Sequence, residues 1–478
     1  MESIKESVIN STKWTAFEKL GVQGVQFVLS IVMARLLTPE DYGIVGMLSV
    51  FLTISTTFVD SGFSNALVRK QEYKEVDYST VFFFNFFVAV VVYLILFFTA
   101  PLIASFFEMP ILTSVLRVQA LSLIINSLTV VQVAKLTRAL DFKSLALLTM
   151  YSNILSGICG IGLAYLGFGV WALVGQVLIQ SVINLLYLVI RYRWYPTTGF
   201  STDSFKELGS YGSRLLASSL LHTLYTQLTT FIIGKFFSAK TLGFYNRAVQ
   251  TVALPKQLFE GVIGKITFPI FAKVQDDKER LINVYRKYIK MSSMCMFFAY
   301  ALLFALSKPL VLFLLTDKWA DCIIYLQLLC FVCMFDNVTS INLTLLKVIG
   351  RSDLYLRLEI IKKTVSVIIL LCAVPFGVVG ICVAKIFYEQ LAIAINTYYT
   401  GKIFNLGYLT QWKDFYIYLI CAIIAVVPAY LLTYLDLPNI VTLIIGAVIS
   451  TTIYVAILWR NPSMKELRTT VLQKIMRR

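Results

Sequence analysis

Charged side chains inside apolar stretches are the residues of this sequence best suited to chemistry. The stretch 242–272 is the richest: it carries Arg247, Lys256 and Glu260, and Pro255 is expected to kink it. Guanidinium and ammonium groups suit phosphate groups, so cations at depth predict a polar cavity that accepts an anionic substrate. Lys256 and Glu260 are also four residues apart, so an internal ion pair that holds two helices together is the alternative.

The candidates for this cationic cavity share a position inside an apolar stretch. They are Arg117, Arg214, Arg247, Lys256 and Lys385. A charge at the centre of a bilayer costs roughly 2.5–3.5 kcal/mol on insertion scales. The last three of these residues lie deepest, where a long side chain cannot easily reach the membrane surface. We therefore expect them to face a water-filled interior.

Acidic residues and a single histidine are the candidates for ion coupling or internal ion pairs. These candidates are Glu18, Asp60, His222 and Glu260, and further carboxylates lie within or at the ends of apolar stretches at Asp336, Glu359 and Glu389. His222 can titrate near neutral pH, but a histidine satisfied by hydrogen bonds between helices is the alternative. Asp60 can likewise simply end its helix, because Ser61 and Gly62 follow it.

Motifs of soluble enzymes are missing from the sequence. It contains no GxxxxGK[ST], no HExxH and no GxGxxG that follows a strand. Cys330 and Cys333 form a CxxC pair within an apolar stretch, where they lack partners for a metal site and are expected to pack. We therefore expect no enzyme, no metal and no cofactor, and H⁺ or Na⁺ coupling stays open.

Transmembrane helices are the elements that must position these residues. Hydrophobic residues make up 58% of the 478 residues and charged residues 14%, against about 45–50% and about 25% in ordinary globular chains. A bilayer core about 30 Å thick needs about 20 apolar residues in a helix. We expect an all-α integral membrane protein with fourteen transmembrane helices, at residues 14–37, 42–66, 79–106, 113–134, 144–166, 170–190, 208–236, 242–272, 289–306, 322–346, 357–374, 378–399, 415–434 and 440–459.

Lysine and arginine are distributed unevenly between the two sides of these helices. Of the 42 lysines and arginines, 30 lie at the termini and in the loops on their side, and three lie in the opposite loops. Because cytoplasmic loops carry the excess of positive charge, both termini are expected in the cytoplasm. The same distribution explains the net charge of +16 without a nucleic-acid partner.

Internal similarity indicates a duplication of six helices. Residues 28–46 align with 228–246 at an offset of 200, and residues 101–107 align with 309–315 at an offset of 208. Six helices are an even number, so the two copies are expected to be parallel repeats. We expect an N-lobe at 1–200, a C-lobe at 201–400, and two extra helices with a basic tail at 401–478. Such repeats are typical of transporters, although a duplication kept only for packing is the alternative.

Several segments resemble the Wzx-type polysaccharide-lipid flippases of the multidrug/oligosaccharidyl-lipid/polysaccharide (MOP) exporter superfamily. They are WTAFEKLGVQGVQFVLSIVMARLLTPEDYGIVGM, FVDSGFSNALVRKQ, IIGKFFSAKTLGFYNRA and FPIFAKVQDD. The ARLLTPEDYG segment is the most specific. Relatives often carry an acid just before the IIG of the seventh helix, where this chain has Thr229 and Thr230. A role for that acid is therefore not expected here.

The resemblance implies two six-helix lobes that form a V around a central cavity in the bacterial cytoplasmic membrane. It implies as substrate an oligosaccharide on a polyprenyl diphosphate, which the protein moves to the outer leaflet by alternating access for surface polysaccharide such as O-antigen or capsule. Arg247, Lys256 and Lys385 would neutralise the diphosphate in transit. Membrane lipids, a polysaccharide polymerase and chain-length machinery are the expected partners. A cation-coupled drug exporter of the same superfamily and a non-transporting membrane scaffold are the alternatives.

Overall fold

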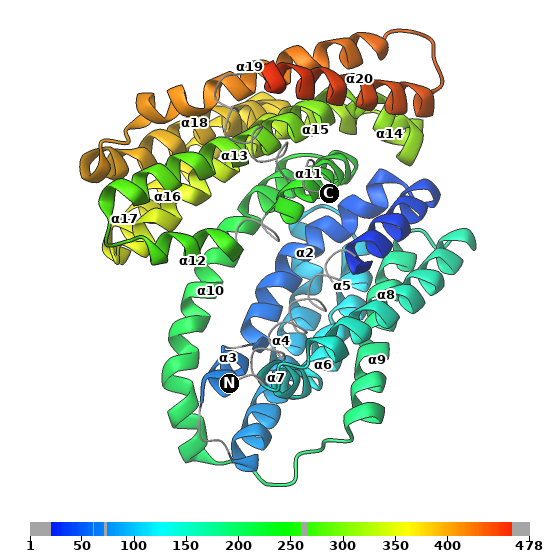
Figure 1. Cartoon of the computed structure of the whole chain (residues 1–478). Helices are drawn as coiled ribbons and strands as arrows, with labels where there is room; N and C mark the ends of the chain where they lie inside the picture. Colours follow the sequence, from blue (N-terminus) through cyan, green and yellow to red (C-terminus); the bar gives the residue numbers. More distant parts are fainter. Residues whose placement is uncertain (1–20, 61, 71–73, 260–264, 461–478) are drawn as a thin grey trace, which may run out of the picture. The chain divides into compact units, whose positions relative to one another are not determined.

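The structure is a computed structural model that describes residues 21–60, 62–70, 74–259 and 265–460. All secondary structure assigned in these residues is helical (Figure 1). The chain divides into two compact units, residues 1–246 and 247–478, and the division falls inside one helix, α11 (Ala239–Phe259). The lobe boundaries expected near residues 200 and 400 stay predictions.

The first unit contains an apolar helix at Gly21–Leu36 and the helices up to the start of α11. These helices are α2 (Pro39–Asp60), α3 (Phe63–Arg69), α4 (Glu75–Phe106), α5 (Ile111–Gln119), α6 (Leu121–Ser127), α7 (Val130–Arg138), α8 (Phe142–Tyr165), α9 (Val170–Tyr192) and α10 (Thr202–Phe236). The long helix α10 packs against α2 and α3, and α8 packs against α9 as a helical hairpin. The unit is therefore held together by neighbours in sequence and by the return of α10 onto its first helices.

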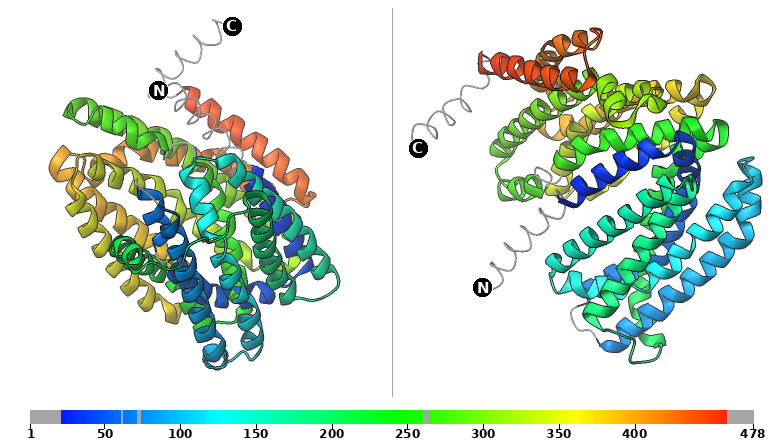
Figure 2. Two further views of the ribbon diagram at one scale, coloured as in Figure 1. Left: turned by 90° about the horizontal axis from the view of Figure 1, so that it is seen from below. Right: turned by 90° about the vertical axis from the view of Figure 1, so that its right-hand side faces the viewer.

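The second unit begins within α11 and contains the remaining helices. They are α12 (Lys265–Lys273), α13 (Lys278–Ala305), α14 (Ser307–Leu315), η2 (Asp317–Trp319), α15 (Cys322–Met334), α16 (Asp336–Val348), α17 (Ser352–Ala373), η3 (Val374–Phe376), α18 (Gly377–Phe404), α19 (Tyr408–Leu432) and α20 (Asn439–Arg460). The last two helices, orange to red in Figures 1 and 2, lie side by side, and α19 also packs along α13. They are thus packed into the second unit.

Nine helices in the described residues are long and apolar enough to cross a membrane, or ten if a bent pair counts as one span. Each of the fourteen stretches expected from the sequence overlaps a helix. Three features account for the lower count. The described part of the first expected stretch, Gly21–Leu36, is shorter than one crossing, and α10 and α11 are too polar. Residues 352–404 count once although 53 residues far exceed one crossing. A multi-pass helical membrane protein is therefore confirmed, whereas the number fourteen stays a prediction.

The starts of α2 and α11, which lie 200 residues apart in sequence, have matching local structure within the first unit. The hydroxyl of Thr38 accepts from the Asp41 backbone N–H at 3.3 Å, and the hydroxyl of Ser238 accepts from the Thr241 N–H at 3.2 Å. Both are N-caps, which satisfy the free N–H groups of a first helical turn. The equivalence of these segments thus extends from sequence to capping geometry.

A reciprocal glycine contact joins the same two helix starts. A Cβ atom on Gly43 would collide with the carbonyl oxygen of Ala239, and a Cβ on Gly243 would collide with the carbonyl oxygen of Pro39. Residues 39 and 239 are themselves equivalent in the internal alignment. The glycine of each segment therefore contacts the same position of the other segment. Only glycine permits this approach of the two backbones.

Replacing Gly43 with alanine is expected to destabilise the protein by about 1–3 kcal/mol, the usual cost of overpacking a close contact. Gly24 is the matched control, because it also lies in a helix and a Cβ there meets no atom within 4 Å. Alanine at Gly24 should be neutral or slightly stabilising. Thermal unfolding of the two detergent-solubilised variants checks this difference, and equal stability of both would contradict the tight contact.

Candidate functional site

Four charged side chains from three helices form a cluster in the second unit. The cluster consists of Lys256 on α11, Asp336 on α16, and Lys385 and Glu389 on α18. The Lys256 ammonium lies 2.8 Å from the Asp336 carboxylate, and the Glu389 carboxylate accepts a hydrogen bond from the Thr339 hydroxyl at 3.0 Å. Lys385 lies about one helical turn before Glu389 on α18. The structure therefore brings two of the predicted cations together with two carboxylates.

Helix geometry explains how these residues converge. Asp336 is the first residue of α16, where a negative charge is favourable near the helix N-terminus. Thr339 follows it by three residues, and Lys385 precedes Glu389 by four, so each pair lies on one face of its helix. The packing of α16 against α18 then brings the two faces together.

The cluster is electrically balanced and only partly accessible. The Lys256 and Asp336 side chains are 39% and 24% exposed, while Glu389 is 7% exposed. Two lysines and two carboxylates give no formal net charge, so the predicted cations are not an open cationic wall in this conformation. An anionic group can engage Lys256 only if it competes with Asp336.

The other predicted cations lie in different surroundings. Arg247 is buried, with 5% exposure. Arg117 donates from Nε to the Phe97 carbonyl at 3.1 Å and lies over the Phe97 ring at 4.2 Å. Arg214 is exposed on α10. The structure thus does not gather all five predicted cations, because Arg117 and Arg214 belong to the first unit.

The candidates for ion coupling are also separated. Asp60, at the end of α2, lines a cavity of the first unit, and His222 is exposed on α10. Glu18 and Glu260 lie outside the described residues, and so does the predicted pair of Lys256 with Glu260. Within the described part of the chain, no three His, Cys, Asp or Glu residues are placed to hold a metal ion.

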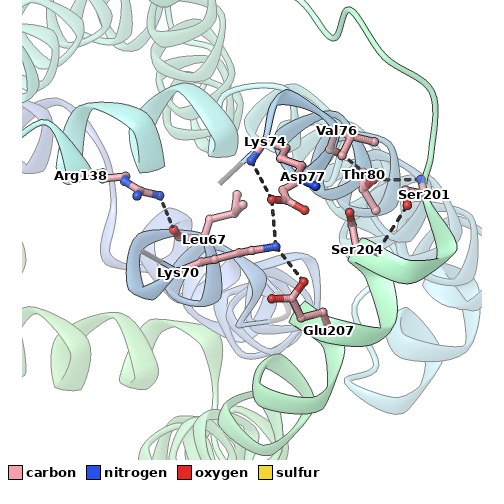
Figure 3. A network of polar contacts seen from close by, with 10 residues as sticks. All are labelled: Leu67, Lys70, Lys74, Val76, Asp77, Thr80, Arg138, Ser201, Ser204 and Glu207. Carbon is pink, nitrogen blue, oxygen red and sulfur yellow. Dashed lines mark hydrogen bonds and ion pairs between the residues drawn. The ribbon is translucent and has the colours of Figure 1, made fainter. Parts of the chain in front are cut away.

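An ion network fastens the first two turns of α10 to the end of α3 and the start of α4 (Figure 3). The Lys70 ammonium lies 3.0 Å from the Asp77 carboxylate and 2.8 Å from that of Glu207, and the Ser201 N–H donates to the Thr80 hydroxyl at 3.0 Å. Burial lowers the pKa of Lys70, but the hydrogen bonds and charges of its two partners outweigh burial and raise this pKa overall. Lys70 therefore stays charged at neutral pH and holds the start of α10 in place.

A buried carboxylate at the start of α19 is a feature that the sequence pattern missed. Asp414 accepts from Arg286 Nε at 2.8 Å and Nη2 at 2.6 Å, and it lies 3.3 Å from the Lys290 ammonium. Its side chain is only 4% exposed. These residues lie at the ends of apolar stretches, and Arg286 and Asp414 are 128 positions apart in sequence. The periodicity of a single helix cannot indicate a contact over such a separation.

Comparison with known proteins identifies the family of the chain. Residues 32–324 match the family described as polysaccharide biosynthesis protein. The teichuronic acid biosynthesis protein TuaB of Bacillus subtilis (strain 168) is 27% identical over 356 residues, which cover 74% of each chain. The lipopolysaccharide biosynthesis protein WzxC of Escherichia coli (strain K12) is 24% identical over 424 residues, 87% of this chain and 86% of that protein. The expected resemblance to Wzx-type proteins is confirmed.

A solved structure shares the fold. The lipid II flippase MurJ in an inward closed conformation superposes with a TM-score of 0.74 at 15% identity, over 95% of this chain and 99% of that chain. The family match and the shared fold bear out the expectation that this chain is not an enzyme. It is a multi-pass membrane protein that belongs to the polysaccharide biosynthesis protein family.

Proposed function

We propose that this chain is a flippase for oligosaccharide repeat units linked to polyprenyl diphosphate. It would move them across the bacterial cytoplasmic membrane by alternating access for assembly of a surface polysaccharide. The observation that carries the proposal is the charged cluster of the second unit, in a chain of a polysaccharide biosynthesis family with the fold of a lipid flippase. A lipid tail needs no charged residue for its passage, whereas a diphosphate needs cations at depth.

The proposal assigns Lys256 and Lys385 to the diphosphate. In the structure Lys256 is held by Asp336, so its charge is stabilised while no substrate is bound. A diphosphate would compete for the same ammonium group, and Asp336 would be released. The diphosphate and Asp336 would thus bind the same ammonium group in turn. Between transport cycles, the carboxylate compensates the charge of the lysine inside the membrane.

Ion coupling, topology and partners belong to the same proposal. Asp336 and Glu389 provide carboxylates on which H⁺ or Na⁺ could act when Lys256 turns to substrate. The fourteen helices would form two six-helix lobes in a V with two further helices, and both termini would lie in the cytoplasm. A polysaccharide polymerase and chain-length machinery would receive the flipped product.

The drug exporter is the second candidate, and charge argues against it. Exporters of amphiphilic cations need an acidic cavity, whereas the charged cluster contains as many lysines as carboxylates. A membrane scaffold would have no need of Lys256, Asp336 and Glu389 inside its helices. Both alternatives predict no transport of a lipid-linked sugar.

A vesicle assay tests the proposal directly. Purified full-length protein is reconstituted into liposomes that carry lipid-linked oligosaccharide, and the fraction accessible to an added glycosidase is followed over time. We expect faster exposure of the sugar than in protein-free liposomes, because the bilayer core alone blocks a charged head group. Imposed H⁺ and Na⁺ gradients then identify the coupling ion. A rate equal to that of protein-free liposomes under every gradient would refute the proposed function.

A further inference from the structure

A cavity of about 550 Å³ lies within the first unit, and its lining residues come from α2, α3, α6, α7 and α10. This volume is typical of sites for small molecules. Valine, leucine and alanine side chains form its apolar walls. Its polar lining includes Thr57, Asp60, Asn126, Thr129, Thr137 and Ser219. The cavity therefore mixes apolar patches with hydroxyl, amide and carboxylate groups.

Two hydroxyls and one carboxylate of the cavity lining are available as hydrogen-bond acceptors. The Thr129 hydroxyl donates to the Asn126 carbonyl at 2.7 Å, and the Thr137 hydroxyl donates to the Val133 carbonyl at 2.9 Å. Each hydroxyl has one proton and two lone pairs, so these two present lone pairs to a ligand. Among the described residues, no side chain is paired with the Asp60 carboxylate. The cavity thus suits a ligand rich in O–H or N–H donors.

The charge of the cavity lining further restricts the class of ligand that the cavity can bind. Asp60 is the only charged residue in the cavity lining, and no lysine or arginine of the described chain contributes to it. A diphosphate or an acidic sugar would be repelled by the carboxylate and would find no cation. A metal ion is also a poor fit, because Ca²⁺ needs six to eight oxygens that converge at about 2.3–2.6 Å, and this volume is far larger than such a site.

We propose that this cavity binds an uncharged sugar, a hexose or an N-acetylhexosamine, of the lipid-linked substrate. Sugar hydroxyls and acetamido N–H groups supply the donors that Asp60, Thr129 and Thr137 accept, and the C–H faces of the ring pack on the valine and leucine walls. The inference rests on the proposed function and adds a class of sugar to it. The diphosphate and the sugar would then be recognised by different residues.

Binding of three defined lipids to the full-length protein in nanodiscs tests the inference. The probes are polyprenyl diphosphate alone, the same lipid with one N-acetylglucosamine, and the same lipid with one glucuronic acid. We expect the N-acetylglucosamine lipid to bind about tenfold more tightly than the bare lipid, and the glucuronic acid lipid to bind no better than the bare lipid. Two hydrogen bonds of ordinary net strength account for a difference of that size.

Variants of the acceptors locate the effect. D60N should weaken binding of the N-acetylglucosamine lipid about tenfold and reduce discrimination against the glucuronic acid lipid, and T137V should weaken the former about fivefold. Neither should change binding of the bare lipid. T99V is the matched control, since Thr99 also donates to a helix carbonyl, at 2.7 Å from Ile95 O, and it does not line the cavity. Size-exclusion profiles establish that all variants are folded.

The outcomes separate this inference from the function on which it rests. Binding of the bare lipid without preference between neutral and acidic sugars would overturn the inference and leave the proposed function intact. Equal losses for all three lipids in D60N and T137V would also overturn it. If the wild-type protein binds none of the lipids, the proposed function fails and the inference fails with it. If D60N abolishes only a dependence on Na⁺, the cavity is a cation site and the inference is wrong.

Discussion

Replacing Asp414 with alanine is expected to destabilise the protein by about 2–4 kcal/mol. The Asp414 side chain is 4% exposed and accepts two hydrogen bonds from Arg286, with Lys290 at 3.3 Å. Removing one partner of a buried ion pair typically costs about 3–5 kcal/mol, because a charge is left without compensation. The Arg286 and Lys290 side chains are 41% and 37% exposed, so water recovers part of this cost. The substitution also removes the ion pairs that join α19 to α13.

Thermal unfolding of the solubilised protein measures this effect, and the chain offers a matched control. Arg351 and Asp353 form the same two-bond geometry, at 2.9 and 2.8 Å, on an exposed surface. D353A should be nearly neutral, since exposed ion pairs contribute little. D414N, which keeps one acceptor oxygen, should fall between D414A and the wild type. If D414A and D353A unfold at the same temperature, burial of Asp414 does not stabilise the packing of α19.

The positions of the helices could be predicted from the sequence because the bilayer imposes a simple rule. Backbone groups in lipid must be satisfied within their own segment, so a long apolar run can be read as a helix without knowledge of its neighbours. The rule is weaker where helices carry polar residues: α10 contains Arg214 and His222, and its composition alone does not mark it as a span. Hydropathy also does not predict helix breaks, such as that at Phe335 between α15 and α16.

The partners of charged residues could not be predicted in the same way. Sequence spacing relates residues within one helix, so it proposed Glu260 for Lys256, four positions away. That pair lies outside the described residues and stays a prediction. The described structure shows Lys256 paired with Asp336, 80 positions away on another helix, a contact that spacing along one helix does not indicate. The Asp414 bridge was missed for the same reason. The sequence thus identified charged residues inside the membrane-spanning stretches. Only the tertiary packing shows that Lys256 and Lys385 lie in a cluster with two carboxylates.

The double variant K256M/D336N is expected to reduce flipping by about 10- to 100-fold while the amount of folded protein stays normal. Both substitutions roughly conserve side-chain volume, and removing both charges leaves no unpaired ion. A hydrogen bond to a charged group contributes about 1.5–3 kcal/mol, so loss of one lysine contact to the diphosphate accounts for a decrease of this size. The vesicle assay gives the rate, and R351M/D353N, which removes the exposed Arg–Asp pair, controls for the loss of a pair as such.

The single variants distinguish substrate binding from a structural ion pair. If Lys256 contacts the diphosphate, K256M should be as slow as the double variant, whereas D336N keeps the ammonium group and should retain more activity. If the pair only holds α11 against α16, each single variant leaves one charge without its partner, and both should be impaired, while the double variant recovers. Recovery in K256M/D336N would therefore remove Lys256 from the transport pathway. Sustained loss there, with D336N more active than K256M, would assign the lysine to substrate and the aspartate to its release.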